Sequence, residues 1–369
     1  MSSISWSPVT AILENKSPGT VVIGRPGSGK TYFLLNVAAN CLLTGCRVIY
    51  IDPKNDAAVL KDIYNDIKIT DVNNISPGAL NPFKILKDIS SNVILSIISC
   101  ICGDLSDNQL VSISPIVNDF VKQNNRDKKN ISFSMLANYL YASSNEDAQT
   151  IGTMLKMNED SKYGKLILSD SSNSESLKIG KTSSEVISLL GLPLPNSNTK
   201  NENLSAEEKF SSAIIYIICK MLREVLTEDN KIPTVLIIDE ARIVFSNKAL
   251  SGIVNDFLTL GRSLNIATVL ASQNITHYPS GIEQLVSSKF MFSSSAKEAA
   301  EFLEAFDATD SNTGIDRSSI IEYIENIEEK INGKGGCFFI DSKNRGGFMR
   351  VKSNLGVTSN PLLKKRAEK

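Results

Sequence analysis

The sequence has few cysteines, and their spacing fits neither a metal site nor a disulfide framework. Cys100 and Cys102 are one residue too close for a CxxC pair, so we interpret them as core residues. Six cysteines in 369 residues also argue against a disulfide-stabilised fold and indicate a reducing compartment. The six are Cys41, Cys46, Cys100, Cys102, Cys219 and Cys337.

Signals for export or membrane insertion are missing as well. Met1 to Gly19 contains no basic segment followed by an apolar run, so no signal peptide is predicted. The longest largely apolar stretch, Val93 to Cys102, is far shorter than the roughly 20 residues that span a bilayer. We therefore expect a cytoplasmic protein, or one held peripherally at the cytoplasmic face of a membrane by its partners.

The chain has no excess of charge of either sign. Its 39 basic and 40 acidic residues give a formal net charge of -1, so any contact with DNA must come from a local patch. The hydrophobic fraction of 42% is enough for a sizeable core. At about 150 residues per domain, the length suggests roughly two domains, or one core with a large insertion.

The first hundred residues contain the pattern of a strand, a helix and a second strand. Thr20 to Gly24 is a short apolar run that ends in glycine, which is typical of a buried strand. Apolar residues then recur at helical spacing from Lys30 to Leu43, and Arg47 to Ile51 is the next strand. A strand–helix–strand unit of this length predicts a parallel sheet.

The pattern changes to helices after Phe83 and returns to strands near Glu185. We predict an α/β class protein with a RecA-like P-loop core, a mainly parallel sheet and an all-helical insertion. The predicted boundaries place the core in residues 1–88 and 181–356. The helical insertion covers 89–180, and a basic tail covers 357–369.

A complete phosphate-binding motif, GxxxxGK[ST], lies between the first predicted strand and the first predicted helix. Its glycines allow the backbone to wrap closely around phosphate oxygens, and the helix N-terminus adds a favourable dipole. Lys30 is predicted to reach the β- and γ-phosphates of ATP, and Thr31 to bind Mg²⁺. The predicted ATP-binding residues are Gly24, Arg25, Pro26, Gly27, Ser28, Gly29, Lys30 and Thr31.

Asp239 and Glu240 follow the apolar run Val235 to Ile238, as the acids of a Walker B motif do. Ligands of open α/β sheets bind at the carboxyl ends of the strands, which is where both acids are expected. We predict that Asp239 holds the Mg²⁺ ion and that Glu240 is the general base or orients the attacking water.

Two later residues are further catalytic candidates. Gln273 follows the predicted strand Ala267 to Ala271, where an amide can hydrogen-bond both the γ-phosphate and water. Arg262 ends a predicted helix and is either an arginine finger for a neighbouring subunit or a residue that compensates the helix dipole. His277, the only histidine, has no visible metal partner and receives no role.

The order of these motifs resembles the ATPase domain of type IV secretion and conjugation motors, with the coupling-protein branch most similar. This group belongs to the HerA–FtsK superfamily of P-loop NTPases. The matching segments are Gly24 to Thr31, Arg47 to Lys54, Leu80 to Phe83, Ile237 to Ala241, Gly261-Arg262 and Ser272-Gln273. The resemblance implies a RecA-like core, a homo-hexamer and channel proteins at the inner membrane as partners. It also favours the arginine-finger interpretation of Arg262.

The chain departs from the coupling-protein pattern in two places. Asn55 follows Asp52-Pro53-Lys54, where those proteins often have glycine. The P-loop begins at residue 24, so the membrane-spanning N-terminal part that such ATPases usually use for docking is expected to be missing from this chain.

Three functional interpretations remain open at this stage. The preferred one is an ATP-driven motor for conjugative DNA transfer or type IV secretion. A DNA translocase or viral genome-packaging ATPase would use the same site to move a different substrate. A nucleotide-gated assembly adaptor would bind ATP without turnover, which the intact Lys30, Asp239 and Glu240 disfavour.

Overall fold

The computed structural model describes most of the chain, and the basic tail predicted at 357–369 lies outside the described residues. The described residues are 6–13, 17–124, 131–169, 176–180, 183–195, 204–245, 247–308, 313–331, 333 and 335–351.

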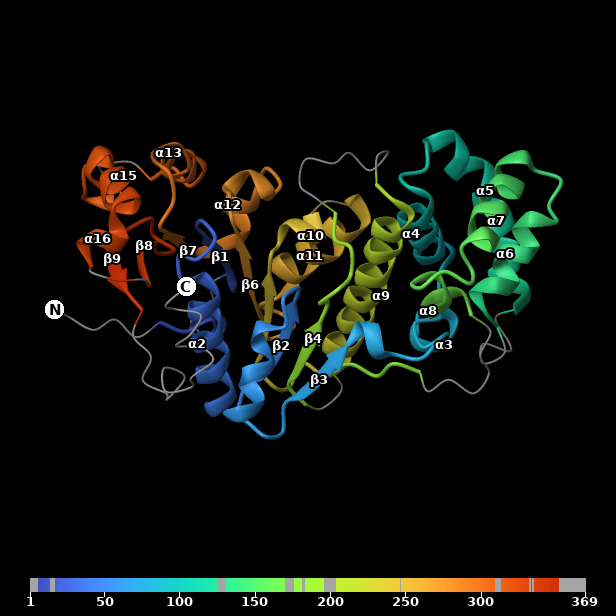
Figure 1. The fold of residues 1–369 in the computed structure, drawn as a ribbon, viewed down its shortest axis with the longest axis horizontal. Helices are drawn as coiled ribbons and strands as arrows, with labels where there is room; N and C mark the ends of the chain where they lie inside the picture. The colour runs from blue at the N-terminus through green and yellow to red at the C-terminus, as the bar shows by residue number, and fades with distance from the viewer. Residues whose placement is uncertain are drawn as a thin grey trace.

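A single sheet crosses the described part of the molecule in the order β3-β4-β2-β5-β6-β1-β7-β8-β9 (Figure 1). In this order, all pairings from β3 to β7 are parallel. Strand β8 pairs antiparallel with β7, and β8 and β9 form an antiparallel hairpin. The strands are β1 Gly19–Ile23, β2 Arg47–Asp52, β3 Lys68–Asp71, β4 Glu185–Ser188, β5 Thr234–Asp239, β6 Ile266–Ser272, β7 Val286–Phe292, β8 Gly336–Ile340 and β9 Gly346–Arg350.

Helices cover both faces of this sheet, because its central strands are apolar on both sides. Side chains such as Val22, Tyr50 and Ile237 form one cluster with α2, whereas Ile51 and Ile238 face the cluster that includes α9. The core helices and 3-10 turns are α1 Pro8–Leu13, α2 Lys30–Leu43, η1 Asp56–Asp62, η2 Val72–Asn74, α3 Pro82–Ile85, α9 Ala206–Glu228, α10 Arg242–Phe245, α11 Lys248–Leu260, η4 Ile275–His277, α12 Ile282–Leu285, α13 Ala296–Ala305, α15 Arg317–Glu325 and α16 Ile327–Lys330.

A block of helices extends from the β3 side of the sheet (Figure 1). Between residues 89 and 169, and again over 176–180, the described chain forms helices and loops but no strand. The proposed insertion boundaries of 89 and 180 enclose this block. Its helices are α4 Ser91–Cys102, α5 Asp107–Asn124, α6 Phe133–Tyr141, α7 Glu146–Met157 and α8 Gly164–Leu168.

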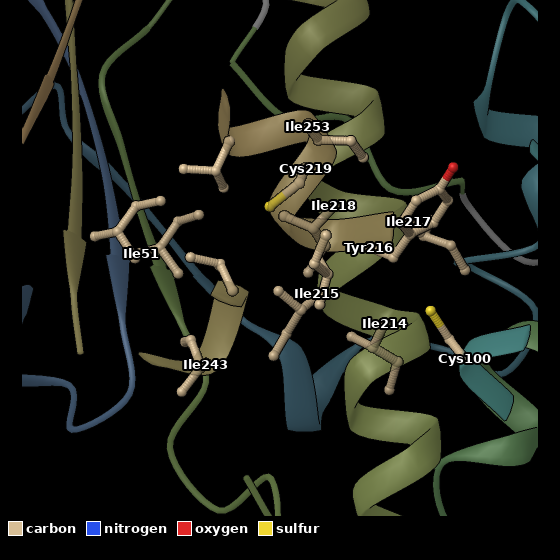
Figure 2. Packing of buried hydrophobic residues seen from close by; sticks show 14 of the residues in the cluster. Ile51, Cys100, Ile214, Ile215, Tyr216, Ile217, Ile218, Cys219, Ile243 and Ile253 are labelled. Carbon is tan, nitrogen blue, oxygen red and sulfur yellow. The ribbon is translucent and has the colours of Figure 1, made fainter. Parts of the chain in front are cut away.

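Helix α9 joins the helical block to the sheet. Ser205 and Glu208 begin it with a reciprocal capping box, which satisfies two backbone N–H groups at its first turn. The helix is buried along most of its length and packs against α4 and α11. Figure 2 shows its side chains between Ile51 of β2 and Cys100 of α4. Cys100 is therefore a core residue, as predicted, whereas Cys102 is only partly buried against the same cluster.

The structure differs from the sequence-based expectations at two elements. Strand β3 was not predicted, because its four residues Lys-Ile-Thr-Asp show little apolar pattern and lie at the edge of the sheet. The helix predicted to end at Arg262 stops earlier, at Leu260, because the chain turns there to enter β6.

Candidate nucleotide-binding and hydrolysis site

The P-loop connects β1 to α2, and its glycines are required by close approach and by backbone conformation. A Cβ on Gly24 would lie 2.7 Å from Phe292 Cβ, so only glycine fits against β7. Gly29 has a φ of 103°, in the left-handed region that favours glycine. Around Gly27 no atom lies within 4 Å of an ideal Cβ, so this part of the loop faces open space. The loop therefore has the open, glycine-lined form that phosphate binding requires.

Lys30 is buried and folds back onto the carbonyls of its own loop. Its Nζ donates to Gly24 O and, over 2.9 Å, to Arg25 O. Burial lowers the pKa of Lys30 to about 8, although Asp239 and Glu240 nearby raise it. The ammonium group thus donates to two neutral carbonyl oxygens here. The charged oxygens of a nucleotide phosphate can take their place as stronger acceptors.

Thr31 and Asp239 form the side of the site where a metal ion would bind. Thr31 Oγ1 donates to Asp239 Oδ2 over 3.2 Å, and the buried Tyr50 hydroxyl lies 3.5 Å from the same oxygen. Burial raises the pKa of Asp239 to about 6; Lys54 and Lys30 lower it, and Asp52 and Glu240 raise it. A cation beside Asp239 would favour its charged form.

This pair of oxygen ligands fits Mg²⁺, which is usually bound by one or two protein groups together with substrate phosphates and water. Among the described residues there is no cluster of three or more His, Cys, Asp and Glu side chains that could hold a metal ion by itself. Thr31 and Asp239 would therefore complete a metal site only together with the phosphates.

Glu240 follows directly and has an unusual backbone. Its φ of 77° is rare for a residue with a side chain and is typical of functional sites. The next residue, Ala241, donates its N–H to Ala271 O over 2.6 Å, which ties this turn to β6. Burial raises the pKa of Glu240, but Lys54, Gln273 and Arg242 outweigh burial and place the pKa below its ordinary value.

The strand order brings Gln273 to Glu240. Strand β6 lies between β1 and β5, so the residue after its end stands between the P-loop strand and the Walker B strand. Gln273 Nε2 donates to Glu240 Oε1 over 3.2 Å. The preceding Ser272 is hydrogen-bonded through its Oγ to His277 Nδ1 over 2.7 Å, so His277 packs against the same end of β6.

Arg262 is not brought to this chain's own site. It is exposed and lies in the turn between α11 and the start of β6, whereas Gln273 follows the end of β6. A seven-residue strand spans roughly 20 Å, so the two residues lie beyond opposite ends of strand β6. Any contact of Arg262 with a nucleotide would have to involve a different subunit.

Lys54, Arg242 and Glu328 lie near the site and had no role assigned from the sequence. Lys54 Nζ pairs with Glu240 Oε1 at 3.1 Å, and Arg242 Nε lies 3.5 Å from Glu240 Oε2. Arg25 of the P-loop pairs with Glu328 of α16 at 3.1 Å. The sequence contained one indication of this group, because Lys54 belongs to a segment that carries the family resemblance. The other contacts depend on tertiary packing.

The conformation of the loop that carries Lys54 explains how asparagine can stand at position 55, where coupling proteins often have glycine. The Asp52 carboxylate accepts hydrogen bonds from the N–H groups of Lys54 and Ala57, over 2.9 and 2.7 Å. The turn between them requires a φ of 58° at Asn55. Asparagine tolerates the left-handed conformation better than most residues with a side chain. Asn55 therefore preserves a turn for which glycine is the usual choice.

No helix in the described parts of the chain is long and apolar enough to cross a bilayer. None of the curated proteins matches the sequence.

Solved structures with a similar fold include two proteins of known name. VirB4 of Thermoanaerobacter pseudethanolicus superposes with a TM-score of 0.69 at 14% identity, over 92% of this chain and 90% of that one. The bacterial conjugative coupling protein TrwBdeltaN70 with bound sulphate gives 0.56 at 14%, over 91% and 85%. The plasmid coupling protein TrwB in complex with the non-hydrolysable ATP analogue ADPNP gives 0.55 at 15%, over the same 91% and 85%.

At these identities the comparison shows a shared fold, and it confirms the predicted α/β architecture with a mainly parallel sheet. The AAA-like domain family matches residues 13–355, which is almost the whole chain. The chain therefore belongs to the AAA-like domain family.

Proposed function

We propose that this chain is an ATP-hydrolysing motor that energises conjugative DNA transfer or type IV secretion. The observation that carries the proposal is the convergence of Lys30, Thr31, Asp239, Glu240 and Gln273 at the carboxyl ends of three adjacent strands. Similar folds occur in VirB4 and in TrwB, a conjugative coupling protein whose structure includes an ATP analogue.

Binding of ATP relies on the P-loop. Backbone N–H groups from Gly27 to Thr31 surround the phosphates, and Lys30 exchanges the carbonyls of Gly24 and Arg25 for phosphate oxygens. Thr31 and Asp239, whose side-chain oxygens lie 3.2 Å apart, would hold Mg²⁺, and the ion would supply positive charge beside the phosphates.

Hydrolysis depends on Glu240 and Gln273. Glu240 is ionised at neutral pH, since its pKa is held below the ordinary value, and it accepts a proton from or orients the attacking water. Gln273 donates a hydrogen bond to one oxygen of that carboxylate, and we expect its amide to bind the γ-phosphate as well. Arg262 supplies positive charge to the site of an adjacent subunit in a homo-hexamer.

The proposed setting is the cytoplasmic face of the inner membrane. Channel proteins of a secretion or conjugation apparatus hold the ring there, and DNA is the candidate substrate. The near-neutral net charge of the chain means that DNA binding would depend on a local basic surface.

Phosphate release from the purified chain tests the proposal. We expect ATP turnover that requires Mg²⁺, and loss of both binding and turnover in Lys30→Ala. The exposed Lys61→Ala is the matched control and should leave both unchanged. ATP binding without turnover would instead identify an assembly adaptor. Turnover with displacement of a DNA triplex, in the absence of any channel protein, would favour a free DNA translocase over a secretion motor.

A further inference from the structure

The two carboxylate oxygens of Glu240 have different surroundings. Oε1 accepts from Lys54 Nζ at 3.1 Å and from Gln273 Nε2 at 3.2 Å. Oε2 is buried and has no hydrogen-bond partner among the described residues. Arg242 Nε lies 3.5 Å from Oε2 as an ion pair without hydrogen-bond geometry. A buried acceptor without a partner is unusual and calls for an explanation.

Hydrogen bonds to the backbone hold the loop that places Lys54 beside Glu240. The Asp52 carboxylate closes the turn through the backbone N–H groups of Lys54 and Ala57. Leu189 N at the end of β4 donates to Asp52 O over 2.8 Å, which fixes the loop to the neighbouring strand. The Lys54 side chain is 53% exposed, whereas that of Glu240 is 6% exposed. A long, partly solvated side chain thus extends over a buried carboxylate from a fixed backbone.

We propose that Lys54 is a positioning residue for Glu240: with Gln273 it clamps Oε1, so that Oε2 is presented as the acceptor for the attacking water. The two donors come from opposite sides of β5, one after β2 and one after β6. Donors on both sides restrict rotation of the carboxylate, which a single donor does not. This inference rests on the proposed hydrolytic role of Glu240.

Replacement of Lys54 by Met tests the clamp, because Met keeps the length of the side chain and removes the charged donor. We expect kcat to fall about 10-fold, the scale of one hydrogen bond to a charged group. The affinity for a non-hydrolysable ATP analogue should change far less than kcat, because Lys54 Nζ bonds to Glu240 rather than to a residue of the P-loop. Lys54→Arg should restore most of kcat, since it restores a cationic donor. Lys61→Met is the matched control on the neighbouring turn.

A double-mutant comparison shows whether Lys54 acts through Glu240. In a Glu240→Gln background, single-turnover hydrolysis should not fall further when Lys54→Met is added. A further fall would mean that Lys54 acts on the nucleotide or on the fold and would overturn the clamp. An unchanged kcat in Lys54→Met, with Glu240→Gln inactive, would also overturn it while leaving the proposed function intact. Full activity of Glu240→Gln would instead refute the catalytic assignment of Glu240 itself.

Discussion

Gln273 and Glu240 are hydrogen-bonded over 3.2 Å, although they lie 33 residues apart and follow different strands. Strands β5 and β6 pair in parallel, so their carboxyl ends lie side by side. The Ala241–Ala271 backbone bond fixes the two turns relative to each other. The amide that would sense the γ-phosphate therefore already contacts the carboxylate that would activate water. A substitution at either residue should therefore alter the orientation of the other side chain.

Replacement of Glu240 by Gln should separate binding from hydrolysis. The amide keeps the shape of the side chain but cannot accept a proton, so turnover at saturating ATP should fall about 100-fold or more, the usual contribution of a general base. Titration with a fluorescent ATP analogue should give wild-type affinity, because the P-loop is unaltered. Glu304→Gln, on the exposed side of α13, should behave as wild type. Wild-type turnover in Glu240→Gln would refute the base assignment.

The affinity for ATP should depend on pH through Lys30. Burial lowers the pKa of free Lys30 to about 8, and bound phosphates would raise it. Both states are protonated below that value, so affinity should be flat from neutral pH to about 8 and should fall at higher pH, where binding must also take up a proton. Titrations between about pH 7 and pH 10 measure this dependence.

Lys30→Arg provides the control for this pH dependence, since arginine does not titrate in this range. The variant should bind with an affinity that does not change across the same titrations. A flat curve for the wild-type chain would show that Lys30 stays protonated and that burial does not control its pKa.

Arg262 should act only between subunits. Arginine fingers contribute about 10³–10⁵ in rate in related phosphoryl-transfer enzymes. We expect low activity in dilute monomer, a specific rate that rises with concentration, and loss of that rise in Arg262→Ala with ATP binding retained. The exposed Arg345→Ala serves as a control.

Mixing the Arg262→Ala and Lys30→Ala chains extends this test. Each mutant supplies what its neighbour lacks, so partial activity should return. An inactive mixture, despite mixed oligomers in native mass spectrometry, would leave Arg262 with a capping role only.

Position 55 should accept glycine and reject β-branched residues. Asn55→Gly retains the turn at a φ of 58°, and its cost should stay below about 1 kcal/mol, because only the entropy of the unfolded chain changes. Asn55→Val should lower the free energy of unfolding by about 1–2 kcal/mol, because a β-branched side chain is strained in this conformation. Urea denaturation of the two variants compares them directly. Equal stabilities would show that the backbone at this turn relaxes.

The sequence alone predicted those parts of the protein that depend on short spacing. GxxxxGK[ST] specifies a loop within eight residues, and runs such as Val235 to Ile238 are apolar enough to indicate buried strands. The P-loop α/β fold predicted from these segments is confirmed by the structure and its relatives. The roles of Lys30, Asp239, Glu240, Gln273 and Arg262 remain proposals.

Only the tertiary structure decided which strand ends meet. Lys54 and Glu240 are 186 residues apart, and they pair because β2 lies next to β5 in the sheet. The backbone of Gly335 likewise packs close to Gly29, where an ideal Cβ would lie 3.2 Å from Gly335 Cα. No local sequence pattern predicts this approach. Strand order follows from how the apolar faces of all helices and strands pack together. That packing energy is a property of the whole chain, so local spacing does not determine it.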